Sequence, residues 1–188
     1  MPTTVTHAVL AGLAAKAFGE RERPLRLWAA AIIVSVLPDA DVLGFSFGVQ
    51  YGDFLGHRGF FHSPFFCLLV SIVCAAALFR HHRPSSGKWL KYVAFLFLLG
   101  AGHGVLDAFT NGGLGVALLA PFVNTRYFFP WTPIPAAPIG MHRSLTGLGL
   151  HVVIWEIKHI WVPVFLALVG FLVVRRRRRR KRDRCERA

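Results

Sequence analysis

Apolar stretches recur along this chain and carry few charges. Of the 188 residues, 54% are hydrophobic, and the mean hydropathy is +0.50, which is too apolar for an ordinary soluble protein. This pattern indicates a polytopic membrane protein. The sequence therefore predicts an all-α fold, a membrane helical bundle of about four to five transmembrane helices, within one membrane-embedded domain over residues 1–174.

Five apolar runs are the expected helices, at residues 5–18, 25–37, 65–79, 89–107 and 161–174. A sixth run, residues 114–123, is broken by Gly115 and Pro121 and fits a re-entrant or interfacial segment. Residues 127–138 combine aromatic side chains with prolines, which suits the membrane interface. Residues 145–157 fit an amphipathic helix.

Basic residues predict the orientation, because Lys and Arg collect in cytoplasmic loops. Residues 16–26, 80–91 and 175–188 contain 18 of the 22 Lys and Arg residues. We therefore expect a protein of the bacterial inner membrane with a basic cytoplasmic tail, residues 175–188. The tail fits an anchor on anionic lipid. Nucleic-acid binding is the alternative, but no aromatic residue is interleaved to stack bases, so we expect no nucleic-acid partner.

His103 and Asp107 form the centre of the candidate site. They are four residues apart in an expected helix, so they share one face and can reach one cation. Gly102 and Gly104 flank His103 and allow other backbone, or a bound group, to come close. This spacing favours a metal ligand pair.

Further groups of the same chemistry are expected at the same, extracytoplasmic level. Asp39 and Asp41 follow the second apolar run directly, and His57 and His62 precede the third. His7 joins them if the first helix crosses the membrane. The acidic pair could instead be a solvated turn, and His7 a polar residue at a helix end.

Mixed His and Asp ligands suit a divalent metal, with zinc foremost and manganese or iron as alternatives. The candidates outnumber the three protein ligands usual at one catalytic zinc, so two ions are conceivable, the arrangement used on phosphoesters. Asp39 or Asp41 could also act as general base. Arg58 and Arg143 could hold phosphate oxygens, or lie at the headgroups as surface arginines.

Several segments resemble a known family. They are Thr6-His7, Leu37-Pro38-Asp39-Ala40-Asp41, His57-Arg58-Gly59-Phe60-Phe61-His62-Ser63, Gly102-His103-Gly104-Val105-Leu106-Asp107-Ala108-Phe109-Thr110, residues 129–135 and Glu156. Together they resemble the bacterial YdjM-like family of predicted membrane-bound metal-dependent hydrolases, some members of which are LexA-regulated. That family is distantly similar to zinc-dependent phospholipase C, an all-helical fold with clustered His and Asp ligands. The resemblance implies hydrolysis of a phosphoester.

Two functions are therefore expected from this sequence. The first is a metal-dependent hydrolase that acts on a small-molecule or lipid phosphoester at the extracytoplasmic face, with membrane lipids as neighbours and candidate substrates. The alternative is a component of a metal-ion or proton transporter that uses the same His and Asp groups. The candidate ligands gather at one end of the helices rather than along their depth, which favours the hydrolase.

Overall fold

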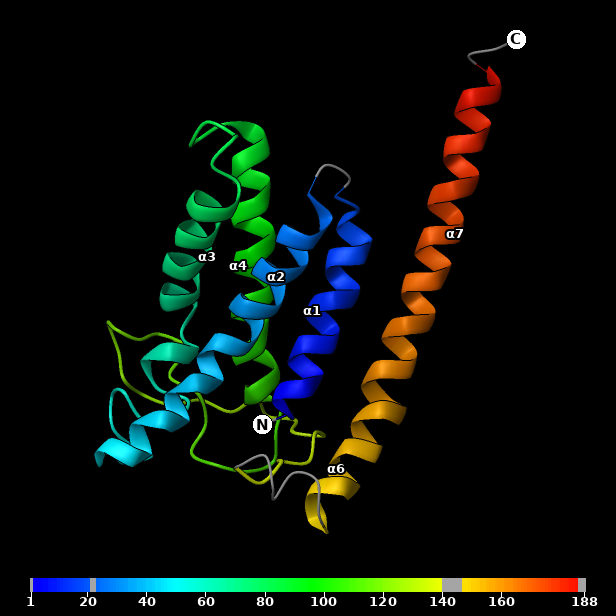
Figure 1. Ribbon diagram of the computed structural model, residues 1–188. Helices are drawn as coiled ribbons and strands as arrows, with labels where there is room; N and C mark the ends of the chain where they lie inside the picture. The colour runs from blue at the N-terminus through cyan, green and yellow to red at the C-terminus, as the bar shows by residue number, and fades with distance from the viewer. Residues whose placement is uncertain (1, 21–22, 140–146, 186–188) are drawn as a thin grey trace.

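The computed structural model describes residues 2–20, 23–139 and 147–185, and these ranges contain helices and no β-strand (Figure 1). The helices are α1 (Thr4–Phe18), α2 (Pro24–Val36), the 3-10 helices η1 (Leu37–Phe47) and η2 (Phe60–His62), α3 (Pro64–Leu78), α4 (Gly87–Ala108), α6 (Leu148–Glu156), the π-helical turn η3 (Ile157–Trp161) and α7 (Val162–Cys185). The predicted all-α fold is confirmed.

Three helical stretches are long and apolar enough to cross a membrane. They are Pro24–Phe47, which joins α2 to η1, Gly87–Ala108, which is α4, and Gly149–Arg178, which runs from α6 into α7. The apolar helices α1 and α3 are shorter, with 15 residues each. The structure is thus a membrane helical bundle, and the number of crossings stays a prediction.

Local sequence signals begin and end the helices. The side chains of Thr3, Ser63 and Ser86 accept hydrogen bonds from the first turns of α1, α3 and α4, which satisfies N–H groups that a helix leaves unpaired. Gly19 ends α1 with a left-handed backbone (φ 74°), a conformation that costs glycine little. These caps set two hairpins, α1–α2 and α3–α4.

Small side chains let the hairpins pack closely. The largest buried cluster is rich in alanine and contains Ala11, Ala15, Leu27, Ala30, Ala31, Val34, Phe79, Tyr92 and Leu96. At Gly100 of α4, a Cβ atom would lie 2.9 Å from Cys67 Cβ and 3.0 Å from Val34 Cγ1. Glycine at this position therefore allows α4 to approach both α2 and α3, a packing mode common in membranes.

The C-terminal helices are continuous, whereas the sequence predicts two separate helices there. Residues 145–157 and 161–174 were expected to form separate helices, but η3 joins α6 to α7 as one helix that continues to Cys185. A π-helical turn, with Pro163 two residues after its end, interrupts the regular hydrogen-bond pattern without ending the helix. Residues 114–123 form no helix, and Val116 pairs with Tyr127 in an isolated bridge.

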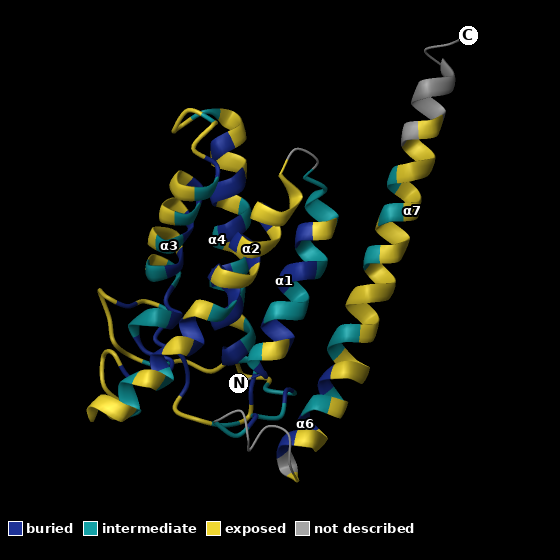
Figure 2. Cartoon of the chain, viewed as in Figure 1, coloured by how far each residue is buried: buried dark blue, intermediate teal, exposed yellow. Residues whose placement is uncertain are grey.

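Two ends of the bundle differ in chemistry. At one end lie the start of α1, η1, η2, the end of α4 and the loop segments that follow it (Figure 1). At the other end lie the α1–α2 and α3–α4 turns, and the arginine-rich part of α7 extends beyond them. The described residues of α7 are mostly exposed (Figure 2), and the buried residues concentrate in α1–α4.

Candidate metal centre

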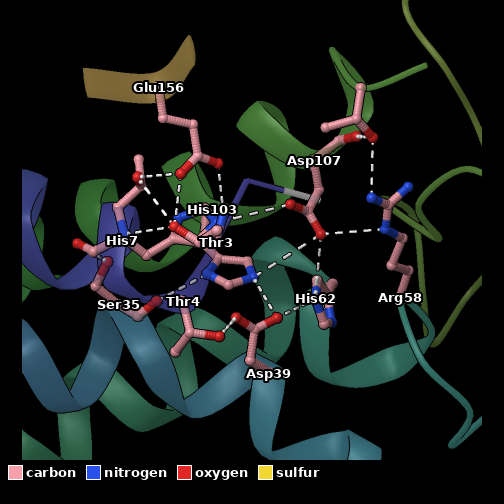
Figure 3. A network of polar contacts seen from close by, with 12 residues as sticks. Thr3, Thr4, His7, Ser35, Asp39, Arg58, His62, His103, Asp107 and Glu156 are labelled. Atoms are coloured by element: carbon pink, nitrogen blue, oxygen red, sulfur yellow. Dashed lines mark hydrogen bonds and ion pairs between the residues drawn. The ribbon is translucent and has the colours of Figure 1, made fainter. Parts of the chain in front are cut away.

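Three histidines and two aspartates from four separate segments converge at the loop-rich end of the bundle (Figure 3). They are His7 of α1, Asp39 of η1, His62 of η2, and His103 and Asp107 of α4, and each is at most 6% exposed. Burying so many ionisable groups together costs free energy unless a partner compensates them. The cluster therefore needs an explanation beyond packing.

Ligand atoms of these five side chains face one another without hydrogen bonds. His62 Nε2 lies 3.6 Å from Asp39 Oδ1 and 3.5 Å from Asp107 Oδ2. His103 Nε2 lies 3.4 Å from Asp39 Oδ1, and His7 Nε2 lies 3.6 Å from Asp107 Oδ1. Among the described residues, all of these atoms are buried and lack a hydrogen-bond partner.

The spacing of these atoms matches a shared metal ion. Two ligands held tetrahedrally at zinc bond lengths lie about 3.3 Å apart, close to the observed separations. Four residues, Asp39, His62, His103 and Asp107, each offer one ligand atom, and these four atoms all lie within 4.8 Å of one another. His7 approaches from the other side, and its ring stacks on that of His103 with centroids 3.7 Å apart. Nitrogen and oxygen donors in this set suit a divalent transition metal.

Hydrogen bonds on the far sides of the ligands hold them in orientation. His103 Nδ1 donates to the Ser35 carbonyl at 2.7 Å, which leaves Nε2 to act as a ligand. Thr4 Oγ1 donates to Asp39 Oδ2 at 2.7 Å, while Oδ1 faces the cluster. Such outer contacts fix the tautomer and direction of metal ligands.

Asp41 and His57 lie one layer outside the five converging side chains. Asp41 Oδ1 accepts a hydrogen bond from His57 Nδ1 at 2.7 Å, and Asp41 Oδ2 accepts one from the backbone N–H of Arg58 at 3.1 Å. The same Oδ2 lies 3.1 Å from His62 Nδ1. A second group able to hold a metal is formed by Asp41, His57 and His62, but in this arrangement Asp41 is positioned to orient His62.

The charge around His62 is strongly negative. Burial by itself lowers the pKa of His62, but the neighbouring carboxylates of Asp107, Asp39 and Asp41 outweigh it and raise the pKa well above 6.5. A positive charge is therefore favoured at this position. A metal ion at the cluster would supply it without a proton.

Arg58 is held inside the protein. Its side chain is 1% exposed, and its Nε lies 3.2 Å from Asp107 Oδ2. The terminal nitrogens donate to the Gly112 carbonyl at 2.7 Å and to Thr110 Oγ1 at 2.9 Å. This geometry favours a role in positioning Asp107 over the predicted contact with substrate phosphate. Arg143 lies outside the described residues.

One glycine admits the backbone of η2 to the centre. A Cβ atom on Gly104 would lie 2.5 Å from the carbonyl oxygen of His62, so only glycine fits beside this ligand. A close approach next to His103 is expected from Gly102 and Gly104 in the sequence. The orienting roles of Thr4 and Ser35 are not, because such residues are common at helix ends and in apolar helices.

Glu156 was noted in the sequence only through the family resemblance. Its carboxylate is completely buried and accepts hydrogen bonds from the N–H and the hydroxyl of Thr3 and from the hydroxyl of Thr6. These contacts join α6 to the N-terminus of α1, one turn before His7. No spacing in the sequence pairs Glu156 with residues about 150 positions earlier.

Comparison with known proteins agrees with the membrane fold. A family described as YdjM inner membrane protein matches residues 1–181. Inner membrane protein YbcI of Escherichia coli (strain K12) is 42% identical over 178 residues, which cover 94% of this chain and all of that protein. No solved structure matches. The chain therefore belongs to the YdjM family of inner membrane proteins.

Proposed function

We propose that this protein is a metal-dependent hydrolase that cleaves a phosphoester at the membrane surface. The observation that carries the proposal is the set of buried, unpartnered ligand atoms on His7, Asp39, His62, His103 and Asp107. If these side chains served only to stabilise the fold, hydrogen-bonded or apolar side chains would do so at a lower cost in free energy. Four of these residues, Asp39, His62, His103 and Asp107, have ligand atoms close enough together to hold one divalent ion, for which zinc is the first candidate.

The residues divide into ligands and orienting groups. A bound ion would supply an acidic water and polarise the phosphoryl oxygen. The Ser35 carbonyl accepts a hydrogen bond from His103, Asp41 Oδ2 lies 3.1 Å from His62 Nδ1, and Arg58 Nε lies 3.2 Å from Asp107 Oδ2. Asp39 is a candidate general base, because it belongs to the cluster and also lines a pocket.

An apolar pocket beside Asp39 supports a lipid as substrate. It has a volume of about 420 Å³, and its lining comprises Thr4, Ile32, Ile33, Val36, Leu37, Asp39 and Ala40. Ile33 is 47% exposed on the apolar surface of a helix long enough to span a membrane. A lipid chain could lie against this surface while its headgroup reaches Asp39, so that the substrate need not leave the bilayer.

The side of the membrane follows from the distribution of basic residues. The metal centre lies at the end of the bundle opposite the arginines of α7 (Figure 1). If those arginines are cytoplasmic, as the enrichment of Lys and Arg in cytoplasmic loops predicts, the centre faces the extracytoplasmic side of the inner membrane.

A transporter for a metal ion or protons is the alternative function. A conduction path needs polar groups along the depth of the helices. In α4, the polar ligands His103 and Asp107 occupy the last turns, whereas Val93 and Leu96 are buried apolar residues nearer its start. This gradient favours a centre confined to one end of the bundle over a path along the helices.

Two assays of one protein preparation, one for hydrolysis and one for transport, test the proposal. The full chain, purified in detergent and loaded with zinc or manganese, is incubated with phospholipids and soluble phosphoesters, with and without a chelator. We expect chelator-sensitive release of a phosphorylated headgroup from at least one lipid. In liposomes, movement of metal ions or protons without hydrolysis of any substrate would support the transporter instead.

A further inference from the structure

We propose that a pocket at the end of the bundle opposite the metal centre binds the anionic headgroup of a phospholipid. The pocket lies between α1, α2 and α7 and has a volume of about 390 Å³. Three cations line it, Lys16, Arg175 and Arg176, together with the apolar surfaces of Trp28 and Leu172. This site is separate from the metal centre and does not depend on the hydrolase function.

Arg175 is fixed rather than free in solvent. Its Nη1 donates to the Ala17 carbonyl at 2.9 Å, at the C-terminal end of α1, where the helix dipole favours a cation. Gly19 makes room for this contact, since a Cβ atom there would lie 2.8 Å from the same Nη1. The bond uses one of the five N–H donors of a guanidinium, so the group is positioned and can still hold an oxyanion.

The pocket carries uncompensated positive charge. Within the described part of the chain, no carboxylate forms an ion pair with Lys16, Arg175 or Arg176. Glu20 also lines the pocket, but its carboxylate accepts hydrogen bonds from the Arg23 N–H and the Tyr92 hydroxyl. A phosphate bound in the pocket would lie near three cations and one carboxylate, and this carboxylate already accepts hydrogen bonds from Arg23 and Tyr92.

The position of the pocket on α7 indicates a lipid rather than free phosphate. Phe171, Val173 and Val174 are 44–51% exposed, and the cationic run starts with the next residue, Arg175. Such a change from apolar to basic marks the headgroup level of a membrane. Because α7 has an exposed apolar surface directly before the pocket, acyl chains can lie along it while the phosphate contacts the cations.

Trp28 supplies a second interfacial feature at the same level. It is 39% exposed, and its ring packs over α1 at Gly12, where a Cβ atom would lie 3.2 Å from Cζ3. Tryptophan favours the boundary between chains and headgroups. An amphipathic pocket of this kind fits one amphipathic molecule, with its phosphate on the cations and its glycerol region against the indole.

Native mass spectrometry of the full chain in detergent can test the site. The dissociation constant of the first bound phosphatidylglycerol is compared with that of phosphatidylcholine for the natural protein, for K16Q/R176Q and for K16Q/R175Q/R176Q. We expect tighter binding of phosphatidylglycerol and a loss of about fivefold for each cation removed, the size expected for one cation at an anionic lipid surface. K16Q/R176Q keeps the contact of Arg175 with α1, so a loss in this variant does not arise from unfolding.

The matched control is R177Q/R178Q/R180Q, which removes the same charge from described positions of α7 that do not line the pocket. It should bind the first phosphatidylglycerol as the natural protein does. An equal loss in the control and the pocket variants would show non-specific attraction to the tail and overturn the proposal. Binding of glycerol phosphate or inorganic phosphate as tight as that of the lipid would overturn the choice of a phospholipid.

Discussion

Glu156 of α6 accepts hydrogen bonds at 2.6 Å from both the backbone N–H and the hydroxyl of Thr3, although 153 positions separate the two residues. The contact fixes the start of α1, and His7 lies one turn further along the same helix. Through Glu156 and Thr3, the C-terminal helix therefore helps to position His7, a candidate metal ligand.

Replacing Glu156 by alanine should destabilise this junction. The change removes the acceptor of the buried Thr3 N–H and Thr6 hydroxyl, and each buried donor left unpaired costs about 1–3 kcal/mol. We expect a lower midpoint of thermal unfolding in detergent and weaker binding of metal. Lys158→Ala, an exposed position on the same helix, is the control, and equal midpoints for the two variants would contradict the role of Glu156.

Two glycines of α4 offer a matched pair of substitutions. Gly104→Ala places a Cβ atom 2.5 Å from the His62 carbonyl oxygen, whereas nothing lies within 4 Å of a Cβ on Gly102. We expect Gly104→Ala to displace His62 and reduce metal content. Gly102→Ala should retain metal and unfold at the same or a higher temperature, because alanine favours a helix by about 1 kcal/mol over glycine. The metal content of both purified proteins tests this prediction, and full metal content in Gly104→Ala would contradict the role of Gly104 beside His62.

Arg58→Lys separates a positioning role from contact with substrate. Lysine cannot reproduce the contacts of the planar guanidinium with Asp107, Thr110 and Gly112. Loss of an outer contact lowers metal affinity by about 10–100-fold, so we expect weaker metal binding by the variant in a titration. If metal affinity is unchanged while KM for a phosphoester rises, Arg58 contacts the substrate as the sequence suggested.

The orientation in the membrane can be tested with single cysteines in a background without the three native ones. Gln50 and Gly87 are exposed. Gln50 follows the end of η1 and Gly87 begins α4, and these two helix termini lie at opposite ends of the bundle (Figure 1). A Cβ on Gly87 meets nothing within 4 Å. With an impermeant thiol reagent on intact cells, we expect labelling of Gln50→Cys and none of Gly87→Cys. The reverse pattern would place the metal centre on the cytoplasmic side.

The helices and part of the candidate metal centre can be predicted from the sequence, because both depend on local patterns. Apolar runs and capping residues such as Ser63 set the helices, and the spacing of His103 and Asp107 places both on one face of α4. The convergence of Asp39 and His62 on that face was expected from their positions at helix ends, and the structure brings them together.

Which residues act as ligands and which as orienting groups depends on the tertiary structure. Asp39 and Asp41 look equivalent in the sequence, but the backbone of η1 directs one to the converging ligands and the other to His57. Arg58 resembles a phosphate ligand until its burial is known. The contact between Glu156 and Thr3 joins distant segments, so no local pattern could predict it.

The metal content of the purified protein tests the central claim most directly. The natural chain, His103→Gln and Asp39→Asn are purified in detergent, loaded with zinc and freed of loose ions, and His151→Gln, at an exposed position, serves as control. We predict about one bound ion per chain, as expected for one shared ligand cluster, in the natural protein and the control, and far less in the two ligand variants at unchanged helix content. A natural protein that binds no divalent ion, or ligand variants that bind as much as the control, would contradict the account.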